Sequence, residues 1–330
     1  MNGNDMRWKP GKRGHYEGYY VAFNHPESAR GYWIRYSMVA PTDTDREPFA
    51  QVWFMRTNRG ATPSNRALRT TYPIGELRAV THQFSVEIGS SALWSDGCRG
   101  KLSDSSGEVS WDLKFESGLP PITPTPEWGA RMATCYIEPN PLLKLTGTIR
   151  ENGEVVSIEG WLGEQAHVFG ARHSQRWHWA ECKHLGGPGR AFTGVAAWPR
   201  LPGPERSVTS LFLDLADGRR LLKNNTLSLF KPRTAHSPAG WEFDGDYGLT
   251  RLAGTITPDP ADLIGVTYHD PSGQPIYCYH SELADLRLRY YTRRSKSDAW
   301  NLEEEISAPG SSAFEYGCST ALEGVPLLLD

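Results

Sequence analysis

The sequence lacks the features that mark membrane, secreted and nucleic-acid-binding proteins. Its 330 residues contain no apolar run of the roughly 18 residues that a membrane-spanning helix needs. Residues 1–14 are polar, without the apolar core of a signal peptide. Lys and Arg number 35 against 38 Asp and Glu, so the net charge is -3 and no basic surface for nucleic acid is expected. We therefore predict a soluble, cytoplasmic protein with no membrane span and no nucleic-acid partner.

Cysteine is scarce, and its spacing indicates neither disulfides nor zinc. The five cysteines are odd in number and widely spaced, and none forms a Cys-x-x-Cys pair. Four histidines lie near one another in the sequence, but without the His-x-x-x-His spacing or cysteine partners of a zinc site: His167, His173, His178 and His184. We expect a reducing compartment and no bound metal.

The signature motifs of several common enzyme classes are also missing. There is no Gly-x-Ser-x-Gly elbow, no Gly-x-Gly-x-x-Gly after a strand, no P-loop and no His-Glu-x-x-His. No sequence motif therefore supports a hydrolase, dehydrogenase or kinase function.

Aromatic residues and turn formers are abundant, which predicts many short strands. The chain has 12 Trp, 14 Tyr and 11 Phe beside 33 Gly and 24 Pro. Asn152-Gly153 separates two strand-like segments, as in a type I′ hairpin. Similar turns are expected at residues 105–107, 216–218 and 271–273, and residues 284–291 alternate with a period of two. Only Leu302–Ile306 and Thr320–Leu329 are weak helical candidates. The fold class predicted is all-β.

A faint internal repeat suggests two domains of similar size. Glu17 precedes an aromatic strand at residues 31–36, and Glu164 precedes another at residues 176–179, almost half a chain length later. The length also exceeds that of one ordinary core. We predict an N-terminal domain over residues 1–152 and a C-terminal domain over residues 153–330.

Two segments carry a resemblance to a known family. Residues 15–20 (HYEGYY) and 31–36 (GYWIRY) are similar to its "HYES" and "FWLRY" strands, and residues 165–179 are similar to its "QGHNWG…RH…RYAW" signature. This is the tandem lipocalin-like family of hydroxyneurosporene synthase, AttH-type proteins and, more distantly, tocopherol cyclase and some pericyclases. Val168 and Phe169 depart from it, since they stand where the family has Asn and Trp.

The resemblance implies a fold and a class of function. The fold would be two lipocalin-like antiparallel β-barrels in tandem. The function would be that of a cyclase, isomerase or hydratase of secondary metabolism, acting without a cofactor on an apolar polyene or terpenoid-type metabolite. The alternative is a non-catalytic carrier of a hydrophobic small molecule, because a barrel of this size can enclose a ligand without chemistry. Nothing in the sequence indicates an oligomeric state.

Protonating an olefin requires an acid, a dry pocket and a group that stabilises the cation. The candidate catalytic residues are Glu17, Glu164, His167 and His173. Burial among aromatic residues would raise a carboxyl pKa towards neutrality. The alternative is that the carboxylates are solvated or paired with Arg35 or Arg176 and that the histidines are structural.

Aromatic faces are expected to line the pocket and stabilise positive charge. Trp177 and Trp179 are two residues apart and should point to the same side of one strand. The alternative is that the tryptophans simply fill two barrel cores. The full set of predicted substrate-binding residues is Trp33, Arg35, Trp53, Gln165, Phe169, Arg176, Trp177 and Trp179.

Overall fold

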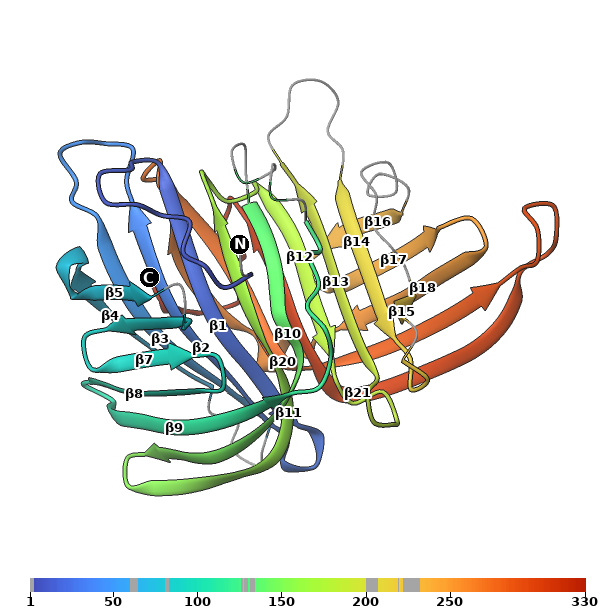
Figure 1. Ribbon diagram of the computed structural model, residues 1–330, viewed down its shortest axis with the longest axis horizontal. Helices are drawn as coiled ribbons and strands as arrows, with labels where there is room; N and C mark the ends of the chain where they lie inside the picture. Colours follow the sequence, from blue (N-terminus) through green and yellow to red (C-terminus); the bar gives the residue numbers. More distant parts are fainter. Residues whose placement is uncertain are drawn as a thin grey trace.

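A computed structural model describes residues 3–59, 65–80, 83–125, 127, 130, 134–199, 207–218, 220–221 and 232–330. The described residues are 66% strand and 4% helix and form two nearly closed antiparallel β-barrels. Figure 1 shows the first barrel in blue to green and the second in yellow to red. The prediction of an all-β fold with two barrels in tandem is confirmed.

The first barrel is one sheet whose strands run in the spatial order β4-β3-β2-β1-β11-β10-β9-β8-β7-β6-β5. Its strands are β1 (His15–His25), β2 (Arg30–Ala40), β3 (Phe49–Asn58), β4 (Arg66–Pro73), β5 (Leu77–Val80), β6 (Ser85–Ile88), β7 (Ser91–Trp94), β8 (Gly97–Asp104), β9 (Gly107–Ser117), β10 (Thr134–Glu151) and β11 (Glu154–Gly170). Short 3₁₀ turns occur at Pro26–Ser28 and Ile74–Glu76.

The second barrel has the order β15-β14-β13-β12-β21-β20-β18-β17-β16, with β19 paired to β20 and, in parallel, to β22. Its strands are β12 (Arg176–Cys182), β13 (Ala191–Trp198), β14 (Val208–Asp214), β15 (Arg220–Leu221), β16 (Arg233–Ser237), β17 (Gly240–Asp246), β18 (Thr250–Thr257), β19 (Ile264–His269), β20 (Pro275–Thr292), β21 (Asn301–Cys318) and β22 (Leu327–Leu329). A 3₁₀ turn occupies Pro260–Asp262.

The β10–β11 hairpin has the predicted turn. Asn152 and Gly153 have φ of 50° and 89°, as a type I′ turn requires at both central residues. Both strands belong to the first sheet, so the expected domain limit at residue 152 falls inside that sheet. The chain passes to the second sheet between Gly170, at the end of β11, and Arg176, at the start of β12.

The two helical candidates were wrong. Leu302–Ile306 lies within β21, and Thr320–Leu329 ends in the short strand β22. This part of β21 pairs with β20, and Ile306 is buried in the barrel core, so tertiary pairing overrides the weak helical spacing. Within the described part of the chain, we find no helix with the length and apolar character to cross a membrane.

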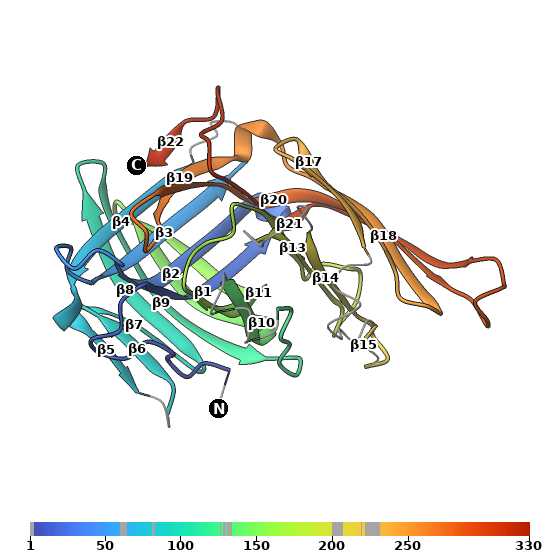
Figure 2. The same cartoon turned by 90° about the horizontal axis from the view of Figure 1, so that it is seen from above.

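Alternate residues of β1 face two different interiors. Tyr19, Val21 and Phe23 belong to the core of the first barrel. Tyr20 and Ala22, which point the opposite way, join a third apolar cluster with Trp179 of the second barrel. Strands from both barrels meet near the centre of the molecule (Figure 2). The contact between the barrels is therefore itself a buried core, and the candidate site lies within it.

Polar contacts fix the two barrels against each other. Arg59 donates to Asp262 Oδ2 at 2.8 Å through Nε, and Asn24 Nδ2 donates to the Glu282 carbonyl at 2.7 Å. At Gly31 an added Cβ would lie 2.1 Å from Glu282 Cβ, so glycine permits this close approach of β2 to β20. The relative placement of the barrels, and of any site between them, is thus built into the sequence.

Candidate active site between the barrels

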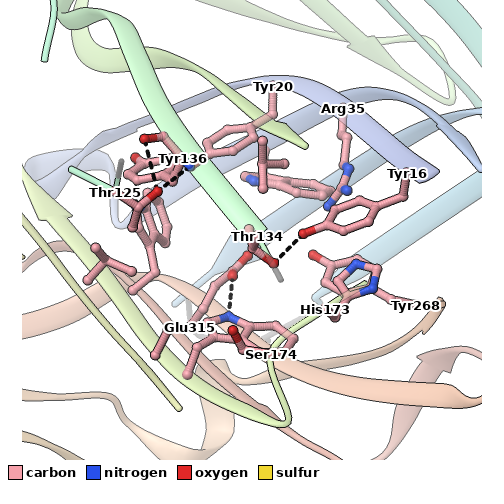
Figure 3. A pocket seen from close by; sticks show the side chains of 16 residues that line it. Tyr16, Tyr20, Arg35, Thr125, Thr134, Tyr136, His173, Ser174, Tyr268 and Glu315 are labelled. Carbon is pink, nitrogen blue, oxygen red and sulfur yellow. Dashed lines mark hydrogen bonds between the residues drawn. The ribbon is translucent and has the colours of Figure 1, made fainter. Parts of the chain in front are cut away.

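A cavity of about 90 Å³ lies between the two barrels, several times the volume that one ordered water needs. Its wall combines strands of both barrels, and its polar side chains converge on one space (Figure 3). We call it the inter-barrel pocket. The lining residues are Tyr16, Tyr20, Trp33, Arg35, Thr125, Thr134, Tyr136, Val168, His173, Ser174, Trp177, Trp179, Val195, Ala197, Tyr268 and Glu315.

Two tryptophans of β12 form part of the wall. Trp177 and Trp179 both line the pocket, as their spacing predicted. Trp177 lies over its cross-strand partner Gly317, where an added Cβ would sit 2.1 Å from the indole. Trp177 Nε1 donates to Glu315 Oε2 at 3.0 Å, and Trp179 Nε1 donates to Tyr136 Oη at 2.8 Å. These hydrogen bonds fix the orientation of both indoles in the pocket wall.

The Tyr136 hydroxyl connects the pocket to buried carboxyl groups. Tyr136 Oη lies 2.6 Å from Glu138 Oε1, 3.1 Å from Glu164 Oε1 and 3.2 Å from Tyr20 Oη. Burial, together with Glu138 and Glu164, raises the pKa of Tyr136 well above its usual value, so the hydroxyl keeps its proton. One phenol proton cannot serve two carboxylates, so one of the two carboxyls must carry its own proton.

Charge balance indicates that Glu138 is that carboxyl. Burial, reinforced by the charge of Glu164, raises the pKa of Glu138 well above its usual value. The ammonium of Lys183 lies 3.3 Å from Glu164 Oε2 and 2.5 Å from Glu181 Oε2, and Thr193 donates to Glu138 Oε2 at 3.0 Å. One buried cation thus faces three buried carboxyls, and this shortage of positive charge favours the acid form of Glu138.

A histidine bridges two further carboxylates at the edge of the pocket. His280 Nε2 lies 2.7 Å from Glu282 Oε1, and its Nδ1 lies 3.3 Å from Glu315 Oε1. Burial opposes protonation of His280, but these two contacts outweigh it and raise its pKa to about 9. The imidazolium donates to both carboxylates and holds the pKa of Glu315 below its usual value despite burial.

His173 brings a neutral imidazole to the pocket. Asp270 Oδ2 accepts the His173 backbone N–H at 2.7 Å and lies 3.1 Å from its Nδ1. The ring stacks on Tyr16 at a centroid distance of 3.9 Å. Burial lowers the pKa of His173, although Asp270 opposes this, and its Nε2 has no hydrogen bond to any described residue. This is the arrangement of an oriented base.

Comparison with known proteins gives relatives in sequence and in structure. No family model matches the chain. An uncharacterized protein of Mycobacterium tuberculosis is 22% identical over 295 residues, 86% of this chain and 83% of its own length.

Three solved proteins share the architecture over more than nine-tenths of this chain. An AttH-type protein of Nitrosomonas europaea has a TM-score of 0.58 at 11% identity, covering 93% of this chain and 92% of its own. Kievitone hydratase of Nectria haematococca gives 0.55 at 12%, covering 92% and 89%. CghA, solved with Sch210972, gives 0.57 at 8%, covering 93% and 88%. This chain has their fold. The fold that the resemblance implied is thereby confirmed.

The predicted site residues fall into two groups. Trp33, Arg35, His173, Trp177 and Trp179 line the inter-barrel pocket. Glu164 lies directly behind it, in contact with Tyr136.

The remaining six candidates lie elsewhere. Glu17, Gln165, His167 and Phe169 project from the opposite side of β1 and β11, away from the pocket. Trp53 packs between the barrels and donates to Ser37 Oγ at 3.1 Å, and Arg176 lies over the Trp198 ring at 5.2 Å; neither lines the pocket.

Glu17 is the centre of a separate buried cluster. Its carboxylate accepts hydrogen bonds from the backbone N–H groups of Arg7 and Trp8, both at 2.7 Å, and from Tyr19 Oη at 3.0 Å. His15 Nε2 at 3.0 Å and His167 Nε2 at 2.8 Å complete the set. Burial alone would raise the pKa of Glu17, but the two histidines outweigh it and hold the pKa well below its usual value.

Several residues of the site were missed in the sequence. The most important are Tyr136, Glu138, Lys183, His280 and Glu315. Tyr136 and Glu138 have the same two-residue spacing that marked Trp177 and Trp179, and that spacing was the available signal. Among the residues described, no group of three or more His, Cys, Asp or Glu is arranged to hold a metal ion.

Proposed function

We propose that the protein is an enzyme that hydrates, cyclises or isomerises an olefinic small molecule in the inter-barrel pocket by acid/base catalysis. One observation carries the proposal: Tyr136 lines the pocket, and its hydroxyl lies 2.6 Å from Glu138, a buried carboxyl whose pKa burial raises well above its usual value. A buried acid that is hydrogen-bonded to a residue of a mainly aromatic cavity is suited to protonating a double bond, which is the first step of these reactions. The fold shared with kievitone hydratase supports a hydratase-type reaction.

The first step is a relay through Tyr136. The phenol proton turns from Glu164 to the substrate carbon, and the carboxyl proton of Glu138 moves to the phenol oxygen. Tyr136 ends neutral, and Glu138 ends as a carboxylate. Thr193 and the nearby ammonium of Lys183 stabilise that carboxylate, so the proton leaves without creating an isolated buried charge.

The second step is capture of the cation. The faces of Trp33, Trp177 and Trp179 stabilise positive charge on the substrate. Water or an internal hydroxyl then attacks, and His173 Nε2, oriented by Asp270, accepts the proton that is released. Loss of a neighbouring substrate proton to His173 instead gives an isomer. The substrate would be an apolar compound of polyene or terpenoid type, and the residues require no cofactor.

The test is product formation in D₂O from a panel of olefins that includes kievitone, with deuterium incorporation read by mass. Tyr136→Phe and Glu138→Gln should each lower turnover by about 10²-fold or more. Tyr36→Phe is the matched control, because it removes another buried hydroxyl that is hydrogen-bonded to Trp111 and Arg99 but lies in the first barrel core.

Two outcomes would contradict the proposal. Full turnover in Tyr136→Phe would remove the relay. Saturable binding of these compounds, with no product from the unaltered protein, would instead indicate a carrier.

A further inference from the structure

Arg35 places a positive charge in the inter-barrel pocket without a hydrogen-bonded partner in the described part of the chain. It lies in β2, is only 7% exposed and lines the pocket. Across the described ranges of the chain it makes no hydrogen bond and no ion pair, and its Nε is fully buried. Its guanidinium lies 4.8 Å from the Tyr268 ring and 5.6 Å from the Trp33 ring. These aromatic faces hold the guanidinium but satisfy none of its donors.

The space for this guanidinium is built into the sequence. Gly18 lies beneath it on β1, and a Cβ at this position would come within 2.7 Å of Arg35 Nε and 2.8 Å of Nη2. Gly18 has no positive φ that would require glycine for backbone reasons. The glycine therefore serves to leave room for Arg35.

Two carboxylates near the pocket, Glu315 and Asp270, are already bound by other donors. Glu315 is bound by His280 and by the Trp177 indole. Asp270 is bound by His173 and by the backbone and hydroxyl of Ser272. A buried guanidinium with no hydrogen-bonded counterion costs stability. A planar oxyanion in the pocket would remove that cost, because guanidinium binds it through two parallel hydrogen bonds.

We propose that Arg35 recognises an anionic oxygen group, a carboxylate or an ionised enol or phenol, on the molecule that occupies the pocket. This rests on the proposed function only in taking the pocket as the substrate site. The substrate is then amphipathic: its apolar, olefinic part lies against Trp177 and Trp179, and its oxyanion lies on Arg35. This binding would fix the position of the double bond relative to Tyr136.

The proposal is tested with matched acids and amides. Geranate and trans-cinnamate, each compared with its primary amide, are titrated against the protein by calorimetry and tryptophan fluorescence. The acid should bind about 10-fold or more tightly than the amide, the range expected of hydrogen bonds between charged groups. Arg35→Gln should abolish this preference, and Arg35→Lys should keep part of it.

Arg69→Gln is the matched control. Arg69 also lies over a tryptophan, 4.8 Å from the Trp53 ring, but it donates to the carbonyls of Thr267 and Asp330 and does not line the pocket. Its replacement should leave the acid-to-amide ratio unchanged. Equal binding of acid and amide, no binding of either acid, or a preference that persists in Arg35→Gln would overturn the proposal.

A stability measurement separates recognition from a structural role. Without ligand, Arg35→Met should melt at the same temperature as the unaltered protein or higher, because the charge it removes has no hydrogen-bonded or ionic partner among the described residues to lose. A clear fall in melting temperature would overturn the proposal. The catalytic proposal fails independently: Tyr136→Phe should keep the acid preference, so a protein that selects acids but turns none over retains this inference and loses the relay.

Discussion

Strands β1 and β11 contribute to two buried charged centres, one on each side of the sheet, and the two are organised in opposite ways. On the inner side, five donors converge on the single carboxylate of Glu17. On the outer side, three carboxyls share one ammonium, and Arg35 has no hydrogen-bonded partner among the described residues. Burial is nearly complete in both. The two centres differ in the ratio of hydrogen-bond donors to carboxyl groups. A high ratio keeps a buried carboxyl ionised and structural, whereas a low ratio favours its protonated form.

The Glu17 cluster ties the N-terminal segment to the first barrel. Its donors include the backbone N–H groups of Arg7 and Trp8, and Gly3 O lies 2.7 Å from His167 Nδ1. Such a site stabilises the fold and leaves no group free to react. The inter-barrel pocket has the opposite character, since its unsatisfied charges lower stability and suit a site that awaits a ligand.

The largest expected effect compares the same substitution at the two centres. Glu17→Gln turns an amide N–H₂ towards the backbone N–H of Arg7 or of Trp8, which can only donate, and we expect it to lower the free energy of unfolding by about 3 kcal/mol or more. Glu138→Gln replaces a carboxyl that is already neutral, and the change should stay within about 1 kcal/mol. Urea denaturation measures both. Equal losses at the two positions would show that the donor ratio does not distinguish them.

The sequence could distinguish these centres only in part. The sequence was enough to predict a hairpin at Asn152-Gly153 and a strand over residues 284–291. It also predicted that Trp177 and Trp179 point to the same side of their strand. Glu17 and Glu164 could not be distinguished as candidates. Both faces of β1 and β11 are buried, so the alternation of apolar and polar residues does not show which face points towards the pocket.

Partners far apart in the chain were also out of reach. Tyr136 meets Glu164 from a neighbouring strand, and His280 meets Glu315 across a hairpin of 18-residue strands, so neither contact leaves a local pattern. The domain limit expected at residue 152 rested on a faint repeat and on the chain length, and neither of these shows which strands pair. Residue 152 lies in a type I′ turn, which joins adjacent strands of one sheet.

The second effect is a difference in pH dependence. The folded pKa of Glu17 is lowered, so its contribution to stability is present above its unfolded pKa and is lost as the pH falls. The folded pKa of His280 is raised to about 9, so its contribution is full below its unfolded pKa and is lost as the pH rises through 9.

Urea unfolding at pH 7.5 and 9.5, compared between the unaltered protein and His280→Gln, measures the His280 contribution. The comparison is needed because burial raises the pKa of all five cysteines, which also lowers stability over this window in both proteins. We expect the unaltered protein to lose about 2 kcal/mol more than His280→Gln, at roughly 1.4 kcal/mol for each pH unit between 7.5 and 9. Equal losses in the two proteins would mean that His280 is neutral and that Glu282 and Glu315 share no imidazolium.

The smallest expected effect tests whether Gly18 belongs to the fold or to the pocket. The three atoms nearest a Cβ at Gly18 all belong to the end of the Arg35 side chain, and the backbone φ there suits any residue. Gly18→Ala should therefore change the free energy of unfolding by less than about 1 kcal/mol. It should also push the guanidinium out of its place and weaken geranate binding about 3- to 10-fold while leaving the amide unaffected. Gly317→Ala is the contrasting variant, because its Cβ would meet the Trp177 ring at 2.1 Å and should destabilise the protein more. If Gly18→Ala destabilised the protein as much as Gly317→Ala, or left geranate binding unchanged, the glycine would not be holding space for Arg35.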